Sequence, residues 1–320
     1  MSRKLQETTT VPSGVTPEGF REWPGVREWL RRKQFSGRTG AQPDTVWRNL
    51  LRKPGAVFGL AILVFLAFIA VFASVLYPGD PMNSVAQPLL SPGENAAYPL
   101  GTDSLGRDVA AAVVHGARTS LSVGVVASVI GLFVGIVLGA LAGYFGGFID
   151  LLLMRITELF QTTPMFLLIV VLVALFQPTA AMISVAIGLT TWETIARLVR
   201  AEFRQLLQSD FVVAARASGF GSFRIIVREI LPNVMPSLIV MISFKVAAAI
   251  FMESGLAFLG LGDPNAVSWG AMINEGRDFL RTAWYLTVVP SVAIVVTVLA
   301  LNLVGDALND VLNPRLRKAS

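Results

Sequence analysis

Long runs without a charged side chain constrain the fold of this chain more than any other feature. Residues 119–149 and 283–305 contain no Asp, Glu, Lys or Arg. A bilayer hydrocarbon core is about 30 Å thick, and roughly 20 apolar residues in a helix cross it. Hydrophobic residues make up 54% of the chain and charged residues 15%, and the mean hydropathy is +0.65. We therefore predict an all-α, polytopic membrane protein rather than a soluble domain.

Six transmembrane helices are expected from these runs. The second contains glycines at spacings that let neighbouring helices approach closely, at positions Gly124, Gly131, Gly135, Gly139 and Gly143. The uncharged stretch 159–192 is interrupted by the Gln-Pro-Thr sequence at 177–179, which predicts a tight turn between two spans. The expected spans are 56–76, 119–149, 158–176, 180–199, 233–258 and 283–305.

Lys and Arg are distributed unevenly along the chain, which predicts its orientation. Residues 1–55 hold eleven of them and residues 197–232 hold six, whereas 78–118 and 259–282 hold two each. Positively charged segments near the ends of spans tend to stay in the cytoplasm. We therefore expect both termini to be cytoplasmic, which agrees with an even number of spans.

Composition also divides the chain into four segments. Residues 1–45 mix Pro, Gly, Thr and charge, and are expected to form a flexible cytoplasmic extension. The next three segments are a first transmembrane helix with an extracytoplasmic loop at 46–117, a core of five transmembrane helices at 118–305 with a cytoplasmic loop at 200–232, and a cytoplasmic tail at 306–320.

Several kinds of chemistry are excluded by what the sequence lacks. The chain has no cysteine and one histidine, His115, so it offers no disulfide, thiolate metal site or histidine cluster. It also lacks the phosphate loop GxxxxGK[ST] and the hydrolase motifs HExxH and GxSxG. We expect this chain to catalyse no reaction and to bind no ATP, metal or other cofactor itself.

A polar segment at 210–232 lies between two of the apolar runs. Ser209 and Asp210 are expected to cap a short helix at 210–218 by accepting bonds from its free amides. Gly219 is expected to supply the left-handed turn that ends this helix. A helix followed by a turn is therefore predicted on the cytoplasmic side.

A second short helix is expected after that turn. Ser222 is predicted to cap it, and Pro232 to stop it, because proline disfavours helical geometry in the preceding residue. Its apolar stripe follows the i, i+3, i+4, i+7 pattern and consists of Phe223, Ile226, Val227 and Ile230. From periodicity alone, an ordinary amphipathic connector between two spans explains the segment equally well.

Two charged residues fall inside the expected fifth span. Lys245 and Glu253 are eight residues apart, about two helical turns, and so share roughly one face. Charges in a membrane are costly and are functional candidates by default. These two side chains are expected to line a translocation pathway or an interface with another subunit, and for Lys245 packing against an acid or a carbonyl is the alternative.

Longer motifs resemble a known family. Ala214 with Ala215, then Gly219, then Leu231 with Pro232 resemble the EAA loop of ABC importer permeases. Over residues 46–317 further stretches resemble the C-type subunit of the dipeptide, oligopeptide and nickel permease family. They are LGTDSLGRDV at 100–109, GARTSL at 116–121, ARLVRAEF at 196–203, ESGLAFLGLG at 253–262, SWGAMINEGRDFL at 268–280 and NLVGDALNDVLNPRLR at 302–317.

This resemblance implies a permease subunit of the bacterial inner membrane with a type I ABC importer fold, which passes peptides or similar small solutes. It implies a homologous B-type permease as partner, two cytoplasmic ATPase subunits that hold ATP and Mg, and an extracytoplasmic binding protein. The coupling residues that it implies are Ala214, Ala215, Arg216 and Gly219. Val213 stands where the family usually has glutamate, so an ion pair through that position is in doubt.

The matched external stretches also imply a surface that meets the binding protein. The residues expected there are Asp103, Arg107, Asp108 and Trp269. A helical cap that seals the pore is the alternative use of the same segments.

The rival class of function is a secondary transporter driven by protons or sodium, with Lys245 and Glu253 as its coupling site. Inverted repeats with broken helices would favour that class, and the sequence shows none clearly. No residue selects among dipeptides, longer peptides, nickel chelates, glutathione and sugars as the solute.

Overall fold

The computed structural model describes residues 48–312. The predicted extension at 1–45 and the end of the predicted tail, 313–320, lie outside the described residues. Within the described range the chain is helical, without a β-strand. Its elements are α3 (Pro54–Val71), α4 (Ala73–Leu76), α5 (Val109–Phe145), α6 (Gly147–Thr162), α7 (Met165–Leu175), α8 (Ala180–Thr190), α9 (Glu193–Leu206), α10 (Asp210–Ala217), α11 (Ser222–Arg224), the π-helix η2 (Ile225–Ile230), α12 (Leu231–Phe258), α13 (Trp269–Gly276), the 3-10 helix η3 (Arg277–Phe279) and α14 (Tyr285–Leu312).

Four of the described helices are long and apolar enough to cross a membrane: α3, α5, the continuous helix Ser222–Phe258 and α14. Two helix pairs also pass this test but are bent, α6 with α7 by 87° and α8 with α9 by 43°. If each bent pair is one span, the total is six, as predicted. The break at 177–179 is confirmed, because α7 ends at Leu175 and α8 begins at Ala180.

The third and fourth spans were predicted to be continuous at 158–176 and 180–199, and this is wrong. The first break lies at Pro164, and the preceding Thr163 is extended, with ψ of 131°. A residue before proline is pushed out of the helical region, so the helix stops there. The second break lies between Thr190 and Glu193.

Helix boundaries differ from the expected segments in three further places. Helix α5 begins at Val109, so the end of the predicted segment 46–117 belongs to the second span. Helix α14 continues to Leu312, into the predicted tail 306–320. The connection between α9 and α11 covers 207–221, inside the predicted cytoplasmic loop 200–232, whose two ends fall within helices α9 and α12.

The glycines of α5 pack against other helices, as predicted. A methyl group at Gly139 would lie 2.5 Å from the Ala196 carbonyl oxygen of α9, and one at Gly124 would lie 2.5 Å from Ile250 of α12. Gly131, Gly135 and Gly143 also face close neighbours, at 3.0, 2.7 and 2.6 Å, from α8, α9 and the break between them. Backbones approach this closely only where no side chain intervenes.

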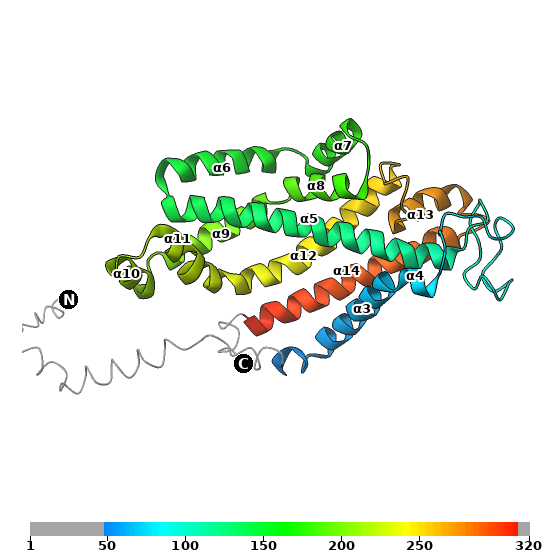
Figure 1. Ribbon diagram of the computed structural model, residues 1–320, viewed down its shortest axis with the longest axis horizontal. Coiled ribbons are helices and arrows are strands. Elements are labelled where there is room, and N and C mark those ends of the chain that lie inside the picture. The colour runs from blue at the N-terminus through cyan, green and yellow to red at the C-terminus, as the bar shows by residue number, and fades with distance from the viewer. Residues whose placement is uncertain (1–47, 313–320) are drawn as a thin grey trace, which may run out of the picture. The chain divides into compact units, whose positions relative to one another are not determined.

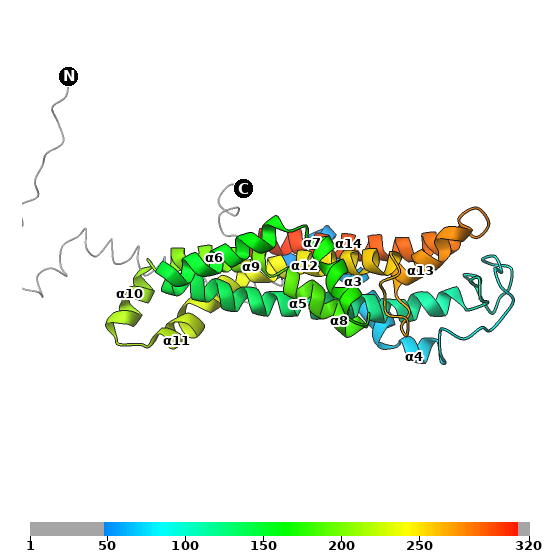
Figure 2. The same ribbon diagram turned by 90° about the horizontal axis from the view of Figure 1, so that it is seen from above.

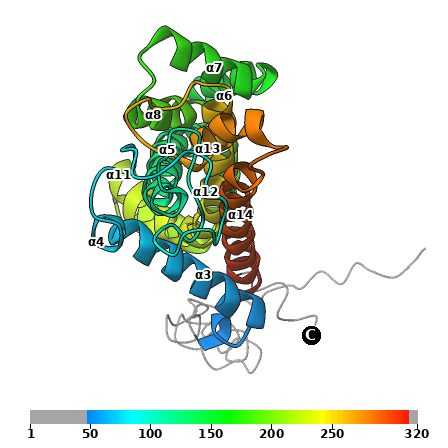
Figure 3. The ribbon, with the colours of Figure 1, turned by 90° about the vertical axis from the view of Figure 1, so that its right-hand side faces the viewer.

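The helices place two groups of short elements at opposite ends. Figure 1 shows α10 and α11 at one end, and α13 with the 77–108 loop at the other; Figure 2 shows the same separation from above. Viewed along the helices in Figure 3, α5 and α12 lie between α3 on one side and α6 with α7 on the other. By the predicted orientation, α10 is cytoplasmic and α13 is extracytoplasmic.

The prediction that a helix ends near Pro232 is wrong, because the helix continues through it. The amide of Leu231 donates to the carbonyl of Ile226, five residues back, so the turn before the proline is a π turn. In an α-helix the proline ring would collide with the carbonyl four residues back. The wider turn moves that carbonyl away, and α12 continues to Phe258.

Candidate functional site

The short helix α10 is fixed to the spans by its inner face. Val212 and Ala215 are buried in one apolar cluster with Phe203 of α9 and with Ile225 and Ile230 of η2. Burying aliphatic side chains of this kind contributes about 1.5–3 kcal/mol each. The helix therefore has a defined position relative to α9 and α12.

The outer face of α10 is exposed. It presents Phe211, Val213, Ala214 and Arg216, while the predicted coupling residue Ala215 points into the core. The predicted cap by the Ser209 side chain is absent, and the Ser209 carbonyl instead accepts from the amides of Val212 and Val213. The exposed surface of α10 therefore combines apolar side chains with the carboxylate of Asp210 and the guanidinium of Arg216.

The turn after α10 is the one predicted. Gly219 has φ of +78°, and its amide donates to the Arg216 carbonyl at 3.0 Å. The next amide, of Phe220, donates to the Ala215 carbonyl at 3.2 Å. Glycine adopts this left-handed conformation without steric cost. A methyl group at Gly219 would touch nothing within 4 Å, so only the backbone angle requires glycine.

The predicted apolar stripe of the second helix is half right, since Ile230 lies in the buried cluster and Ile226 packs against it, but Phe223 and Val227 do not. Phe223 is 79% exposed and Val227 is 39% exposed, whereas Ile225 and Ile230 are buried. The buried pair is five residues apart because the segment is a π-helix, in which i and i+5 share a face. The predicted Ser222 cap is also absent, since Gly221 takes the N-cap position without a side-chain bond.

A charged cluster joins α6 to α9 near this end. Asp150 is buried, and its carboxylate accepts from Arg200 and, at 2.5 Å, from Arg204. Bidentate arginine–carboxylate contacts are strong and geometrically specific. They fix α6 beside α9, on which α10 is packed.

A second charged group lies at the break between α8 and α9. The ammonium of Lys245 donates to the Thr191 carbonyl at 3.1 Å and interacts electrostatically with Glu193. Glu193 is buried, and its Oε2 has no hydrogen-bond partner among the described residues. Arg197, one helical turn after Glu193, forms no ion pair with it and donates to Gln161 at 2.7 Å.

Glu253 and Trp269 are packed inside the chain. Glu253 is 2% exposed and accepts from the Ser120 hydroxyl at 3.1 Å. Trp269 is fully buried, and its indole donates to the Val113 carbonyl at 3.0 Å. Two predictions therefore fail in this conformation: Glu253 does not face an open pathway, and the Trp269 side chain cannot contact a binding protein. Both join α5 to the α12–α13 region instead.

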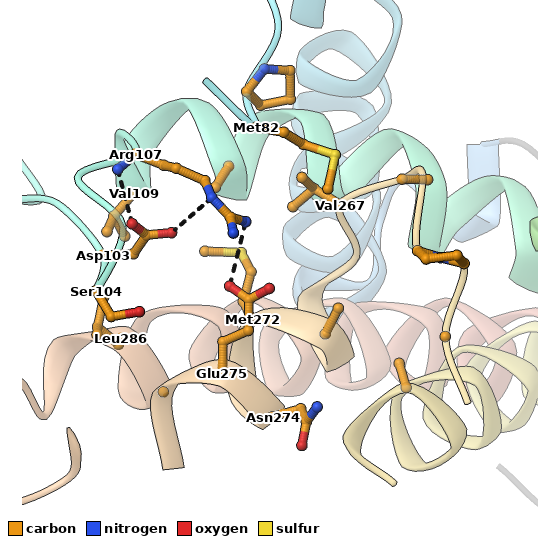
Figure 4. A pocket seen from close by; sticks show the side chains of 18 of the residues that line it. Met82, Asp103, Ser104, Arg107, Val109, Val267, Met272, Asn274, Glu275 and Leu286 are labelled. Carbon is orange, nitrogen blue, oxygen red and sulfur yellow. Dashed lines mark hydrogen bonds and ion pairs between the residues drawn. The ribbon is translucent and has the colours of Figure 1, made fainter. Parts of the chain in front are cut away.

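A pocket of about 180 Å³ opens at the extracytoplasmic end, between the 77–108 loop and α13 (Figure 4). Arg107 lies in its wall, 3.5 Å from Asp103 and 3.5 Å from Glu275. Two of the predicted external residues, Asp103 and Arg107, are therefore brought together here. Asp108 instead lines a neighbouring pocket with Tyr77 and His115, and caps α5 by accepting from the Ala110 amide at 2.9 Å. Burial raises the pKa of the Asp108 carboxyl.

Comparison with known families shows which protein family this chain belongs to. Residues 135–318 match the model of the binding-protein-dependent transport system inner membrane component, which is more than half of the chain. Residues 44–92 match the N-terminal TM domain of oligopeptide transport permease C. The chain belongs to this family of inner-membrane transport components. It is a multi-pass permease of the bacterial inner membrane, and not a secondary transporter.

Individual relatives agree with this assignment. The permease is 40% identical over 275 residues to the dipeptide transport system permease protein DppC of Bacillus subtilis, covering 85% of each chain. It is 38% identical over 301 residues to the glutathione transport system permease protein GsiD of Pectobacterium atrosepticum, covering 91% of this chain and all of that one. A chain of the inward-facing MetNI methionine ABC transporter matches the fold with a TM-score of 0.52 and 19% identity, over 63% of the permease and 96% of that chain.

Two charged residues of the permease escaped the sequence reasoning. Asp150 and Glu275 each interact with a residue far away in the sequence. Asp150 carried one signal, since it ends the long uncharged run 119–149. Nothing local indicates its partners, because they lie on α9.

Proposed function

We propose that this permease forms one half of a translocation pathway for short peptides or similar small solutes, together with a homologous permease subunit. Two cytoplasmic ATPase subunits would drive it, and an extracytoplasmic binding protein would deliver the solute. The names of the relatives support this proposal, since they include a dipeptide permease and a glutathione permease. ATP and Mg would be held by the ATPase subunits, because this sequence has no phosphate loop.

The observation that carries the proposal is the construction of α10. Its inner residues Val212 and Ala215 fix it to the spans, and the side chains of its outer face are exposed. A helix held in this way moves together with α9 and α12. Contacts made by an ATPase on Ala214, Arg216 and Gly219 would therefore be transmitted to the membrane helices, while Ala215 would act by positioning the helix.

Arg216 supplies the one charge on this face of α10 near the turn. Its guanidinium lies 5.5 Å from the centre of the Tyr144 ring at the end of α5. Cation–π contacts at exposed sites contribute about 0.5–1 kcal/mol. Arg216 would thus link the coupling surface to α5 as well, without the family's usual glutamate, which is Val213 here.

Gly219→Pro tests the coupling role. Proline fixes φ near −65°, whereas Gly219 requires +78°, so the turn after α10 must change. In proteoliposomes with the complete set of subunits, we expect the ATPase subunits to remain bound and to hydrolyse ATP while solute uptake is lost. Gly221→Ala is the matched control, because Gly221 has φ of −67° and open space around it.

Unchanged ATP-dependent uptake by Gly219→Pro would contradict the coupling role of this turn. Uptake that persists without any ATPase subunit would contradict the proposed energy source. Binding of ATPase subunits must be measured in the same preparation, because a variant that fails to assemble tests neither statement.

A further inference from the structure

The extracytoplasmic pocket combines an apolar wall with a charged rim (Figure 4). Met82, Val267, Met272 and Leu286 contribute apolar side chains to its lining. Methionine side chains are unbranched and adapt to irregular partners. The pocket volume of about 180 Å³ is close to that of cavities that bind a single aromatic ring, and smaller than pockets that enclose whole ligands. It therefore suits one side chain rather than a complete peptide.

The charges around the pocket favour a cation. Three carboxylates line it, those of Asp103, Asp263 and Glu275, against the single guanidinium of Arg107, which leaves a formal charge of −2. The two external segments 77–108 and 259–284 together contain seven acidic and three basic residues. The field of the whole outer end therefore has the same sign as the pocket. Such a field speeds the encounter with a basic surface.

Glu275 is the carboxylate best placed to bind an incoming cationic group. Its side chain is 47% exposed, and its one ion pair among the described residues, to Arg107, is long at 3.5 Å. Asp103 is more constrained, because its Oδ1 accepts from the amides of Leu105 and Arg107. Asp263 accepts from the Ala180 and Asn265 amides. Glu275 therefore retains the most capacity for a further charged hydrogen bond.

We propose that this pocket receives one lysine or arginine side chain of the extracytoplasmic binding protein. The inference rests on the proposed function, in which such a protein docks at this end. The aliphatic stem of the incoming side chain would lie along Met82 and Met272, and its charged head would bind Glu275 beside Asp103. Long basic side chains bury their stems on apolar surface in this manner while the head group keeps polar partners.

Charge reversal of Glu275 tests the proposal. In the complete transporter in nanodiscs, we expect Glu275→Lys to weaken binding of the purified binding protein by at least about tenfold, because like charges are then placed together. Asp278→Lys is the matched control, since it makes the same charge change three residues away and Asp278 does not line the pocket. We expect a change of no more than about twofold there, as for other exposed rim charges.

A photo-crosslinking amino acid at Asn274 identifies the occupant. Asn274 lines the pocket and its side chain is uncharged, so replacing it leaves the charge of the pocket unchanged. Mass spectrometry of the crosslinked product is expected to find a binding-protein peptide that contains Lys or Arg. Replacing that residue by Glu in the binding protein is expected to restore binding to Glu275→Lys.

The outcomes separate this proposal from the proposed function. If the binding protein does not bind the unchanged transporter, the proposed function fails. If it binds, but Glu275→Lys and Asp278→Lys are equivalent, the pocket proposal is overturned and the function stands. Unchanged affinity for the binding protein with a raised KM for uptake would likewise overturn it, and would assign the pocket to an ammonium group of the solute.

Discussion

The two charged side chains of α12 each bond a residue outside that helix. Lys245 bonds the Thr191 carbonyl at the break in the fourth span, and Glu253 bonds Ser120. A charge at membrane depth is costly unless it is paired. Glu193 stands out, because its Oε2 lacks a hydrogen-bond partner within residues 48–312 and Lys245 is a cation that interacts with it. We therefore propose that Lys245 holds the break between α8 and α9.

Replacing Lys245 by Met is expected to lower the stability of the transporter. Glu193 would then be buried without the cation that interacts with it electrostatically, and an unpaired charge at membrane depth is costly. The double variant Lys245→Met with Glu193→Gln removes both charges and is expected to recover most of the loss. Thermal unfolding of the purified transporter in detergent measures both effects. A native Tm for Lys245→Met together with a raised KM for uptake would instead assign Lys245 to the solute pathway.

At the scale of elements, the cytoplasmic connection owes its form to a π-helix. The sequence pattern read with α-helical spacing selects Phe223, Ile226, Val227 and Ile230, whereas the structure buries Ile225 and Ile230. The π turn shifts the face of the helix and also lets it pass Pro232. Because α10 packs on this segment, the π-helix determines where the proposed coupling surface lies.

Alanine substitutions distinguish the two readings of this segment. Ile225→Ala is expected to destabilise the purified chain by about 2–5 kcal/mol, since it leaves a cavity in the cluster below α10. Phe223→Ala is expected to change stability by less than about 0.5 kcal/mol, because that side chain is exposed. Thermal unfolding of both variants in detergent is the measurement. A larger loss for Phe223→Ala would mean that the segment is an ordinary α-helix.

At the scale of the described chain, the two ends of the helices differ in chemistry. The end with α10 contains Arg200, Arg204, Arg216 and Arg224. The opposite end, with α13 and the 77–108 loop, has the acidic pocket. This polarity agrees with the orientation predicted from Lys and Arg, in which the basic end faces the cytoplasm. One face is thus suited to ATPase subunits and the other to a basic partner.

Cysteine labelling checks that orientation directly, because the chain has no cysteine of its own. Ala96→Cys in the external loop is expected to react with a membrane-impermeant maleimide on intact spheroplasts. Ser218→Cys, after α10, is expected to react only once the membrane is permeabilised. Both positions are exposed, so burial does not account for a difference. Labelling of Ser218→Cys from outside would reverse the topology.

The sequence by itself determined the membrane class, the approximate location of the long apolar helices, the glycine contacts of α5 and the turn at Gly219. These features follow from local properties: runs of uncharged residues, residue spacing along one helix, and a backbone angle that glycine adopts most easily. The family resemblance, now confirmed, added the class of transporter.

Only the tertiary structure decided which charges meet and which faces are buried. Three contacts join elements that are remote in sequence: Asp150 with Arg200, Lys245 with Thr191, and Arg107 with Glu275. No local sequence pattern predicts these contacts. The burial of Trp269 and Glu253 was misjudged for the same reason. The π-helix accommodates both Pro232 and the packing of α10 on Ile225 and Ile230. Neither the proline nor the apolar spacing alone predicts it.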